Sequence, residues 1–566
     1  MNINKMFPEG TKRRKIAKKI YNRIYKYTDE ERKYKKWIEK NEPSKQELKK
    51  QKEEKFEINP KISIIIPVFN TPKNFFAELV KSLQNQTYSN WELCLGDGSP
   101  KELEFMKEYT KKDKRIKYKF IGENKGISGN TNEALSLATG DYIGLLDHDD
   151  LLPKHSLYEI VKVINSNPKV EFIYSDEDKL ETIKGPRYGV FFKPDFSPYT
   201  LNSANYICHF SVFKKDLMDK LEGFRSEYDG SQDFDIVARA SELTNNIEHI
   251  SKVLYHWRAH KNSTAQNSDS KPYAFEVGKK VIKDHIKRSL NTDVEVTDGL
   301  TPGSYEVKYI PNKDEKITII IDARNNSKDI EKIIEKVKIS TYKNYEILTI
   351  ADNFNSKDEN IKNINPTLNV FKDYNRAVSL AKGEYFIIID ENLVEVDKPD
   401  YLQDLLGVAQ DQKVGIVGTK LYNEDGQVEH SGIIMGMNGA GDFLYKGAPK
   451  DIGTYMQRLL IIHNLSCVYT KYAMINKKAF QEVGGFSSEY TGICEHIDLS
   501  LKMLELKKQV VINPIISICV KKLSQSEKIN TEEEKIQKDW KKYYEKGDIY
   551  FSPNLSKNDT GLSFNI

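Results

Sequence analysis

The chain reads Lys61-Ile-Ser-Ile-Ile-Ile-Pro-Val-Phe-Asn70, and it reads Lys316-Ile-Thr-Ile-Ile-Ile-Asp-Ala-Arg-Asn325 at an offset of 255 residues (316 − 61). Three further pairs of segments match in the same order along the chain. They are residues 87–97 with 342–352, residues 132–142 with 375–385, and Gly223-Phe224 with Gly485-Phe486. Agreement at several places in one order indicates an internal repeat. The sequence therefore predicts two related domains.

Each half is predicted to be an open α/β sheet. Short, β-branched apolar runs such as residues 62–66 and 142–146 are typical of parallel strands buried on both faces, and helical patterns lie between them. The predicted fold class is α/β, with two tandem, Rossmann-like domains whose sheets are mostly parallel. The predicted boundaries are a basic helical N-terminal extension at 1–59, a first domain at 60–297, a linker at 298–314, a second domain at 315–523 and a helical C-terminal tail at 524–566.

Length and composition exclude several classes of protein. A chain of 566 residues is too long for a disulfide mini-scaffold and long enough for two or three domains. The five cysteines are odd in number and form no CxxC pair, which indicates a reducing compartment. No apolar run approaches the roughly 18 residues that cross a bilayer, and the N-terminus lacks an apolar secretion core. We therefore expect a cytoplasmic protein.

Positive charge is concentrated at the N-terminus, although the whole chain has 87 Lys+Arg against 83 Asp+Glu. Residues 1–27 carry nine Lys or Arg and one acid, a net charge of +8. Ile16, Ile20 and Ile24 recur every four residues, which predicts a basic amphipathic helix. Such a helix either lies peripherally on the anionic inner face of the cell membrane or packs on the protein's own body. Nothing else in the chain indicates nucleic acid as a partner.

Polar clusters follow three predicted strands of the first half. Asn70 comes after the first strand, Asp97-Gly-Ser99 after the next, and Asp147-His-Asp-Asp150 after residues 142–146. Because ligands bind at the carboxyl ends of the strands in such sheets, these residues are expected to share one cleft. Carboxylates in D-x-D spacing can hold Mg²⁺ or Mn²⁺ and leave positions open for a phosphate. The motif alone is weak evidence for a metal site, because solvated turns that bind no metal are often rich in aspartate too.

Two later segments supply further candidates. Gly230-Ser-Gln-Asp-Phe-Asp235 places two acids at a predicted helix start. His256-Trp-Arg-Ala-His260 supplies imidazoles and a guanidinium, which suit a metal or a pyrophosphate.

With these motifs, the chain resembles the family-2 glycosyltransferases with a GT-A fold, and among them the bacterial rhamnosyltransferase-like proteins of surface-polysaccharide assembly. The resemblance covers residues 60 to about 555. It rests on an ordered set of motifs: Pro67-Val-Phe-Asn70, Asp97-Gly-Ser99, residues 124–132, Gly140-Asp-Tyr142 leading to Asp147-His-Asp149, Tyr174-Ser-Asp-Glu-Asp178, Ser231-Gln-Asp-Phe-Asp235 and Leu254-Tyr-His-Trp-Arg258.

The resemblance implies an activity and a role for each motif. The activity is inverting transfer of a sugar from a nucleotide-diphospho-sugar to a glycan or lipid-linked acceptor, with dTDP-L-rhamnose favoured over a UDP-sugar as donor. Asp149 and His256 are implied ligands of Mn²⁺ or Mg²⁺, and Asp233 is the implied general base. The implied nucleotide-sugar-binding residues are Val68, Asn70, Asp97 and Asp147, joined by Arg258, whose guanidinium suits a pyrophosphate.

The residue types fit this chemistry. A base that removes the proton of the acceptor hydroxyl typically contributes roughly 10²–10⁴-fold to the rate, and no covalent nucleophile is needed. Other roles remain open at this point. Asp233 alternatively caps a helix or forms an ion pair, and His256 alternatively is a core or surface histidine. Asp235 is expected to be structural or to bind the acceptor, and the histidines expected to be solvated are His148, His155 and His260.

Two other function classes can be compared with the sequence. A nucleotidyltransferase is disfavoured, because Phe69-Asn-Thr-Pro72 stands where such enzymes carry a Gly-rich basic loop. A glycan-binding scaffold with two inert domains remains an alternative, and it predicts no turnover of any nucleotide-sugar.

The second half keeps residues that support the fold and loses those that support the chemistry. The repeat aligns Asp149 with Asn392, Asp233 with His496 and His256 with Cys519, although it keeps an acid at the counterparts of Asp97 and Asp147. An amide and a thiol are poor ligands for Mg²⁺ or Mn²⁺. We therefore expect a catalytically silent second domain that scaffolds the first, binds acceptor glycan or mediates assembly. The alternative is a bifunctional enzyme with His496 as its second base.

Overall fold

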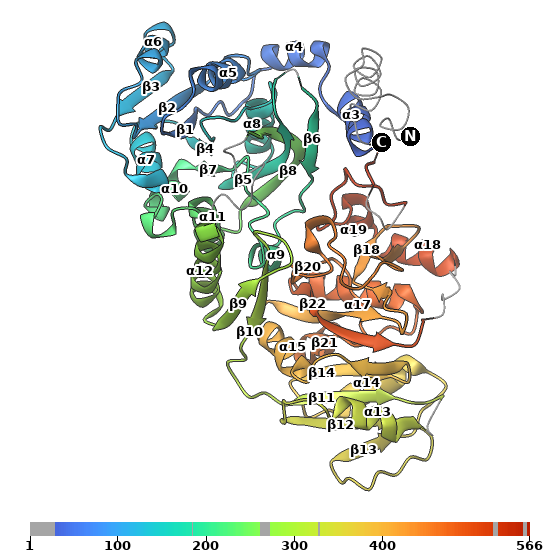
Figure 1. Cartoon of the computed structure of the whole chain (residues 1–566). Helices are drawn as coiled ribbons and strands as arrows, with labels where there is room; N and C mark the ends of the chain where they lie inside the picture. Colours follow the sequence, from blue (N-terminus) through green and yellow to red (C-terminus); the bar gives the residue numbers. More distant parts are fainter. Residues whose placement is uncertain are drawn as a thin grey trace, which may run out of the picture.

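The computed structural model describes residues 29–183, 185–260, 272–325, 329–523, 530–558 and 563–565. The basic amphipathic helix predicted for residues 1–27 lies outside this part of the chain. Within it, no helix is both long enough and apolar enough to cross a membrane. Two sheet-based halves follow one another, the first in blue and green at the upper left and the second in yellow to red at the lower right (Figure 1).

The first half is built on an eight-stranded mixed sheet with the order β3-β2-β1-β4-β7-β5-β6, in which β8 also pairs with β5. The strands are β1 (Ile62–Val68), β2 (Trp91–Asp97), β3 (Ile116–Phe120), β4 (Tyr142–Leu145), β5 (Phe172–Leu180), β6 (Arg187–Phe191), β7 (Val212–Lys214) and β8 (Ile247–Arg258). The helices are α5 (Lys73–Gln84), α6 (Glu104–Lys112), α7 (Gly126–Leu135), α8 (Ser156–Ser166), α9 (Pro198–Leu201), α10 (Lys215–Leu221), α11 (Gln232–Leu243) and α12 (Pro272–Leu290). Strands β1 to β4 run parallel, and β7 is antiparallel to both β4 and β5.

Strand β1 shows why the apolar run becomes a central strand. Ile62 and Ile64 are fully buried, and Ile65 on the opposite face is 1% exposed, so both faces of the strand are covered. Burying one such side chain stabilises the fold by about 1.5–3 kcal/mol. The strand ends at Val68, and Asn70 beyond it adopts a left-handed backbone with φ of 50° that turns the chain over the sheet edge.

The second half repeats this strand order. Its sheet has ten strands in the order β13-β12-β11-β14-β21-β16-β22-β15, with β17 on β16 and β20 on β22. The strands are β11 (Ile317–Asp322), β12 (Tyr345–Ile350), β13 (Ile361–Ile364), β14 (Tyr385–Asp390), β15 (Leu393–Val396), β16 (Val414–Tyr422), β17 (Val428–His430), β20 (His463–Asn464), β21 (Met474–Asn476) and β22 (Gln509–Val520). Its helices are α13 (Ile330–Val337), α14 (Val370–Leu380), α15 (Tyr401–Ala409), α16 (Lys477–Glu482) and α17 (Ile493–Glu505). The predicted class, α/β with two parallel-rich open sheets, is confirmed.

The halves are joined by a hairpin, and one hydrophobic cluster contains residues of both. Strands β9 (Val294–Asp298) and β10 (Tyr305–Tyr309) pair antiparallel, so the segment predicted as a linker at 298–314 contains a strand. Tyr309 is 2% exposed and packs with residues of both halves. At a second contact, the Tyr199 backbone N–H of α9 donates to Asn464 Oδ1 of β20 at 2.9 Å. The domain boundaries predicted from the sequence stay a proposal. The two halves contact each other through the hairpin and through α9 and β20.

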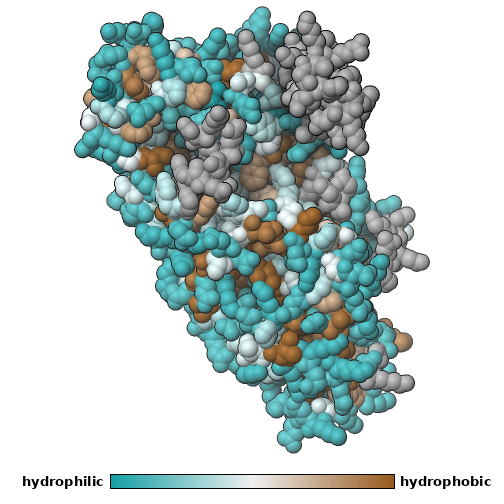
Figure 2. Space-filling view, viewed as in Figure 1, coloured by the Kyte–Doolittle hydropathy of each residue, from teal (hydrophilic) through white to brown (hydrophobic). Residues whose placement is uncertain are grey.

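The N-terminal extension and the C-terminal tail pack beside each other. The extension forms α3 (Asp29–Asn41) and α4 (Lys45–Glu53), and the tail forms α18 (Asn530–Asp539) and α19 (Lys541–Lys546). Helix α4 begins with a capping box, because Ser44 Oγ accepts from the Glu47 N–H while the Glu47 carboxylate accepts from the Ser44 N–H. Trp37 of α3 packs against Phe192, and Phe564 of the tail lies edge-on to the same ring. The viewed face is mostly hydrophilic, with smaller hydrophobic groups through its middle and lower part (Figure 2).

Candidate active site

The acidic motif lies on a turn at residues 147–150 that follows β4. Strand β8 fixes this turn, because the Arg258 backbone N–H donates to Asp150 Oδ1 at 2.7 Å and the Tyr255 hydroxyl donates to Asp150 Oδ2 at 2.5 Å. Asp150 is fully buried, and burial together with the charges of Asp149 and Asp147 raises its pKa. Asp150 therefore anchors the turn, while Asp147 and Asp149 are partly exposed.

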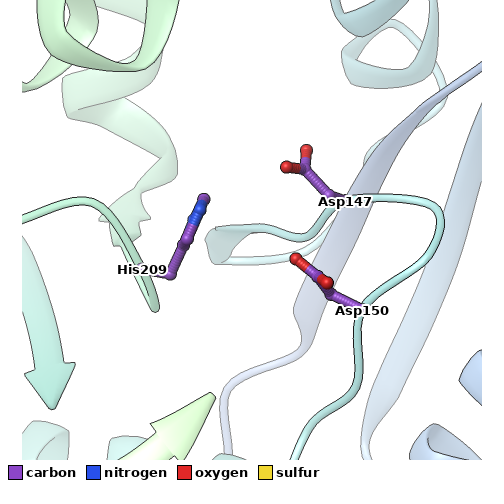
Figure 3. A group of neighbouring side chains, drawn as sticks. All are labelled: Asp147, Asp150 and His209. Carbon is purple, nitrogen blue, oxygen red and sulfur yellow. The ribbon is translucent and has the colours of Figure 1, made fainter. Parts of the chain in front are cut away.

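A group of metal-ligand type gathers beside this turn. Ligand atoms of Asp147, Asp150 and His209 lie within 4.8 Å of one another. Figure 3 shows Asp147 and Asp150 extending from the turn, and His209 coming from the loop that precedes β7. The His209 ring stacks on Tyr255 with a centroid distance of 4.4 Å. Because both oxygens of Asp150 already accept hydrogen bonds, Asp147 and His209 are the members best placed to meet a ligand.

A cavity of about 400 Å³ brings the turn together with the predicted base. Asp147, His209 and Asp233, the last from the first turn of α11, all line this cavity. Asp233 Oδ2 accepts from Asn205 Nδ2 at 3.0 Å. Burial raises the pKa of Asp233, nearby His209 lowers it and Asp147 raises it further, so that the net shift is upward. A carboxylate with a raised pKa in a cavity has the properties of a general base.

The residues predicted to hold the nucleotide meet at the ends of β1 and β2. Val68 and Asp97 are register partners, and the Gly98 N–H donates to the Val68 carbonyl at 3.0 Å. Asp97 is fully buried, accepting from the Tyr118 hydroxyl at 2.6 Å and from the Ser99 N–H at 2.9 Å. The Asn70 N–H donates to Ser99 Oγ at 2.8 Å. The structure thus brings Val68, Asn70 and Asp97 together, with Asp97 shaping the loop through Ser99.

The two predicted metal ligands have different partners. Asp149 Oδ2 lies 2.7 Å from Nε2 of His260, just beyond the end of β8. His256 lies within β8, and its Nδ1 is 2.6 Å from the buried Asp178 Oδ1. His256 also lines a second cavity, of about 790 Å³, which Asp149 does not line. The structure therefore offers His260, and not His256, as the imidazole next to Asp149.

Arg258 is buried behind the acidic turn. It is 2% exposed, its Nε donates to the Asp149 carbonyl at 2.6 Å, and its guanidinium forms an ion pair with Glu78 at 2.7 Å. The same guanidinium stacks over Phe75 at 4.6 Å from the ring centroid. These contacts are with protein groups, and the 400 Å³ cavity is lined by other residues, so Arg258 supports the turn. The expectation of solvated histidines is wrong for His155, which is 4% exposed and whose pKa burial lowers to about 3.

The counterparts in the second half form a different site. His496, aligned with Asp233, is 3% exposed, and burial followed by the charge of Lys471 lowers its pKa well below the usual value. Its Nδ1 lies 2.7 Å from Thr470 Oγ1. Asp390, aligned with Asp147, forms an ion pair with Lys471 at 3.2 Å. His496 is therefore neutral and enclosed, so a substrate cannot reach it as it could reach a base in the first site. Asp390 is already paired with Lys471, so its carboxylate is less available to a metal than the acids of the first site.

Sequence patterns missed His209, His260 and Tyr255 as parts of this site. His209 is far from every motif in sequence, and only the antiparallel pairing of β7 with β4 brings its loop to the acidic turn. His260 lies within the quoted His256-Trp-Arg-Ala-His260 segment, so the signal for it was present. What the segment could not show is that β8 ends at Arg258, which leaves His260 to reach Asp149.

Comparison with known proteins finds a family match within the first half. Residues 63–222 match the family model described as Glycosyl transferase family 2. This stretch is similar to the family-2 glycosyltransferases. The matched residues run from β1 through the acidic turn to the end of α10, and they include the ends of β1 and β2 described above.

The curated proteins that resemble this chain are longer than it. An uncharacterized protein, y4gI, of Sinorhizobium fredii is 34% identical over 468 residues, which are 78% of this chain and 51% of that protein. The O-antigen biosynthesis protein RfbC of Myxococcus xanthus is 27% identical over 488 residues, 83% of this chain and 38% of that protein. The chain thus spans about half or less of the length of these relatives. Among solved structures, S. aureus TarS 1–349 with UDP-GlcNAc is 18% identical, with a TM-score of 0.34 over 40% of this chain and 67% of that chain.

Proposed function

We propose that the first half is an inverting glycosyltransferase that moves a sugar from a nucleotide-diphospho-sugar to a glycan acceptor. The observation that carries the proposal is the cavity that Asp147, His209 and Asp233 line together, at the carboxyl ends of the strands of a family-2 domain. Asp233 would remove the proton of the acceptor hydroxyl that attacks C1 of the sugar. Asp97, Val68 and Asn70 would form the nucleotide end of the same cleft.

A divalent cation, Mn²⁺ or Mg²⁺, fits the residues beside this cavity. Two ligands that bind one cation at about 2.1 Å in adjacent positions lie about 3 Å apart. Asp149 Oδ2 and His260 Nε2, at 2.7 Å, approach that spacing, and a carboxylate with an imidazole suits Mn²⁺. We propose Asp149 and His260 as its ligands, in place of Asp149 and His256. When bound, the cation would stabilise the charge of the departing diphosphate.

The chain's own residues prepare the reaction in three ways. Asp150 and Arg258 hold the acidic turn rigidly through the hydrogen bonds to β8. Asn205 orients the Asp233 carboxylate, and the raised pKa of Asp233 makes it a better proton acceptor than an exposed aspartate. His209, stacked on Tyr255, adds a polar ring to the cavity that Asp233 also lines.

We further propose that the second half is catalytically silent and serves as a scaffold for the first. Three observations support this. Asn392 stands where the first half has Asp149, and His496 is buried. Lys471 forms an ion pair with Asp390, the counterpart of Asp147. The bifunctional alternative needs an accessible base, which a 3% exposed His496 does not provide.

The donor and the setting are proposed more narrowly from the family resemblance. It favours dTDP-L-rhamnose over a UDP-sugar, and the name of RfbC, an O-antigen biosynthesis protein, supports an acceptor in surface-polysaccharide assembly. Residues 1–27, with a net charge of +8, would hold the enzyme peripherally on an anionic membrane. Deleting residues 1–27 should release the protein from anionic liposomes but not change its behaviour with neutral ones.

The decisive experiment is a donor panel with the full chain. Nucleoside diphosphate release and sugar transfer are followed by mass spectrometry with dTDP-L-rhamnose, UDP-glucose and UDP-N-acetylglucosamine, each with Mn²⁺, Mg²⁺ or a chelator. Turnover of one donor that stops with the chelator supports the proposal. If no donor turns over and neither UDP nor dTDP shifts the melting temperature in the presence of metal, the chain is a non-catalytic scaffold.

A further inference from the structure

A buried carboxylate connects the N-terminal extension to strand β8. Asp178 of β5 is fully buried and has three partners. The Tyr34 hydroxyl of α3 donates to Asp178 Oδ2 at 2.5 Å, Arg187 Nε donates to the same oxygen at 2.5 Å, and His256 Nδ1 lies 2.6 Å from Oδ1. Tyr34 itself is 1% exposed and stacks on Trp37. Helix α3 therefore contributes a buried polar contact to the sheet, in addition to its apolar packing.

The connection continues from β8 to the acidic turn. The His256 N–H donates to the Leu151 carbonyl at 2.9 Å, and the Leu151 N–H donates back to the His256 carbonyl at 3.2 Å. Two residues later, Arg258 holds the carboxylate of Asp150 and the carbonyl of Asp149. A shift of β8 by a fraction of an ångström would move the whole turn, since these hydrogen bonds tolerate little change in length.

The second half provides an internal comparison. In the first half, β5 pairs with β8 so that Asp178 is the register partner of His256. In the second half, β16 pairs with β22 so that Tyr422 is the register partner of Cys519. The half that lacks the acid aligned with Asp149 thus also lacks the buried carboxylate and histidine pair. The second half forms the same parallel pairing of strands without this pair, so the sheet as such does not require Asp178.

The buried hydrogen-bond network around Asp178 carries a desolvation penalty that an apolar core would not have. A buried carboxylate must be compensated by several donors, and an apolar set of the same volume is often as stable or more stable. Burial raises the pKa of Asp178, but His256 and then Arg187 more than offset this, so that the pKa is lowered and Asp178 stays charged. A charged anchor with three fixed donors defines the position of β8 more sharply than apolar contacts do.

We propose that Tyr34, Asp178 and His256 are positioning residues that set the acidic turn, through β8, in the geometry that binds the metal and the donor. That the turn binds a metal and a donor rests on the proposed function. That the three residues position the turn does not depend on it. Because Tyr34 lies on α3, the N-terminal extension would influence the active site without contacting it.

The test uses Tyr34→Phe in the full chain, with Tyr199→Phe as matched control. Tyr199 is 2% exposed and donates its hydroxyl to a carboxylate, that of Asp411, at 2.9 Å, so both variants lose one hydrogen bond between a buried tyrosine and an acid. Asp178→Asn serves as a second variant, because the amide keeps the volume and removes the charge. Two readouts are used: hydrogen–deuterium exchange of peptides covering residues 146–152, and Mn²⁺ binding followed by electron paramagnetic resonance.

The proposal expects faster exchange at residues 146–152 in Tyr34→Phe and Asp178→Asn, and unchanged exchange there in Tyr199→Phe. It expects Mn²⁺ affinity to fall about 10-fold in Tyr34→Phe, the low end for groups that orient metal ligands indirectly. Wild-type exchange at residues 146–152 in both Tyr34→Phe and Asp178→Asn would overturn the proposal. If the wild-type chain binds no Mn²⁺, the proposed metal site fails, and the exchange measurement alone then decides the positioning role.

Discussion

Replacing Asp233 by asparagine separates catalysis from stability. The Asp233→Asn substitution keeps the volume of the side chain, and the new amide oxygen can still accept the hydrogen bond that Asn205 Nδ2 now donates at 3.0 Å. The cavity loses a base and no packing contact. Removal of a positioned general base costs roughly 10²–10⁴-fold in kcat, which corresponds to about 2.7–5.5 kcal/mol in the activation barrier.

Stability is expected to change in the opposite direction. Burial raises the pKa of Asp233 above the value of an unfolded chain, although nearby His209 partly offsets the shift. A carboxyl with a raised folded-state pKa binds its proton more tightly in the folded state, so its contribution to stability is greatest at low pH and is lost as the pH rises through the folded pKa. At neutral pH the charged Asp233 therefore costs stability. Asp233→Asn removes that cost and should melt at the same temperature as the wild type or a higher one.

The assay combines three measurements on the same preparations. Turnover with the donor found in the panel should fall at least about 100-fold in Asp233→Asn, while the shift in melting temperature on binding of UDP or dTDP with Mn²⁺ should persist. The wild-type kcat should decline as the pH falls through the raised pKa of Asp233, because the base must be ionised. Retained turnover would refute the assignment of the base. A lower melting temperature with lost activity would show that Asp233 is a structural residue.

Three further outcomes can be measured in the same way. Asp149→Ala and His260→Ala should each weaken Mn²⁺ binding at least about 100-fold by calorimetry, since each removes a proposed ligand, whereas loss of binding in neither variant would place the metal elsewhere. Asn392→Ala should leave turnover unchanged, and a loss there would show that the second half is active. Burial lowers the pKa of His249, but the buried carboxylate of Asp176 more than offsets this, so the pKa is raised. The ion pair of His249 with this carboxylate should therefore stabilise the fold fully below about pH 6.5, and progressively less as the pH rises through the raised pKa. The gap in melting temperature between the wild type and His249→Gln should therefore narrow from pH 6 to pH 9, and a constant gap would show that the residue acts through packing alone.

The parts of the site that sequence could predict are those fixed by strand order. Residues 62–66 and 142–146 are apolar and β-branched, and they form neighbouring parallel strands whose ends hold Asn70 and the acidic turn. In a parallel sheet all carboxyl ends meet at one edge, so polar residues after the strands converge whatever the lengths of the crossovers. The pattern alone therefore predicts that Asp97 and Asp147 lie at the same edge of the sheet.

The histidines could not be assigned in this way. From the sequence alone, His256 and His260 would be expected on the same side of one extended strand, because side chains alternate with a period of two residues. They would then be about 13 Å apart along it, at about 3.3 Å per residue. In the structure β8 ends at Arg258, before His260. Which of them reaches Asp149 depends on where β8 ends relative to the turn, and that end is set by its pairing with β5 up to Leu180 and Arg258. No local signal in the sequence encodes this register.

The second half carries a lysine at the position that His209 holds in the first half. Matching the pairing of β4 with β7 to that of β14 with β21 aligns His209 with Lys471, as it aligns Asp147 with Asp390. Lys471 Nζ lies 3.2 Å from Asp390 Oδ2, and the burial that opposes its charge is more than offset by neighbouring tyrosines and acids, so its pKa is raised. A permanent ammonium thus neutralises the acid that in the first half stands beside an imidazole. An ammonium that is tied to the chain cannot leave with a diphosphate or be exchanged, and its charge removes the attraction that the acid would exert on a divalent cation. The substitution fits a half that is kept for the contacts of β20 with α9 and no longer for chemistry.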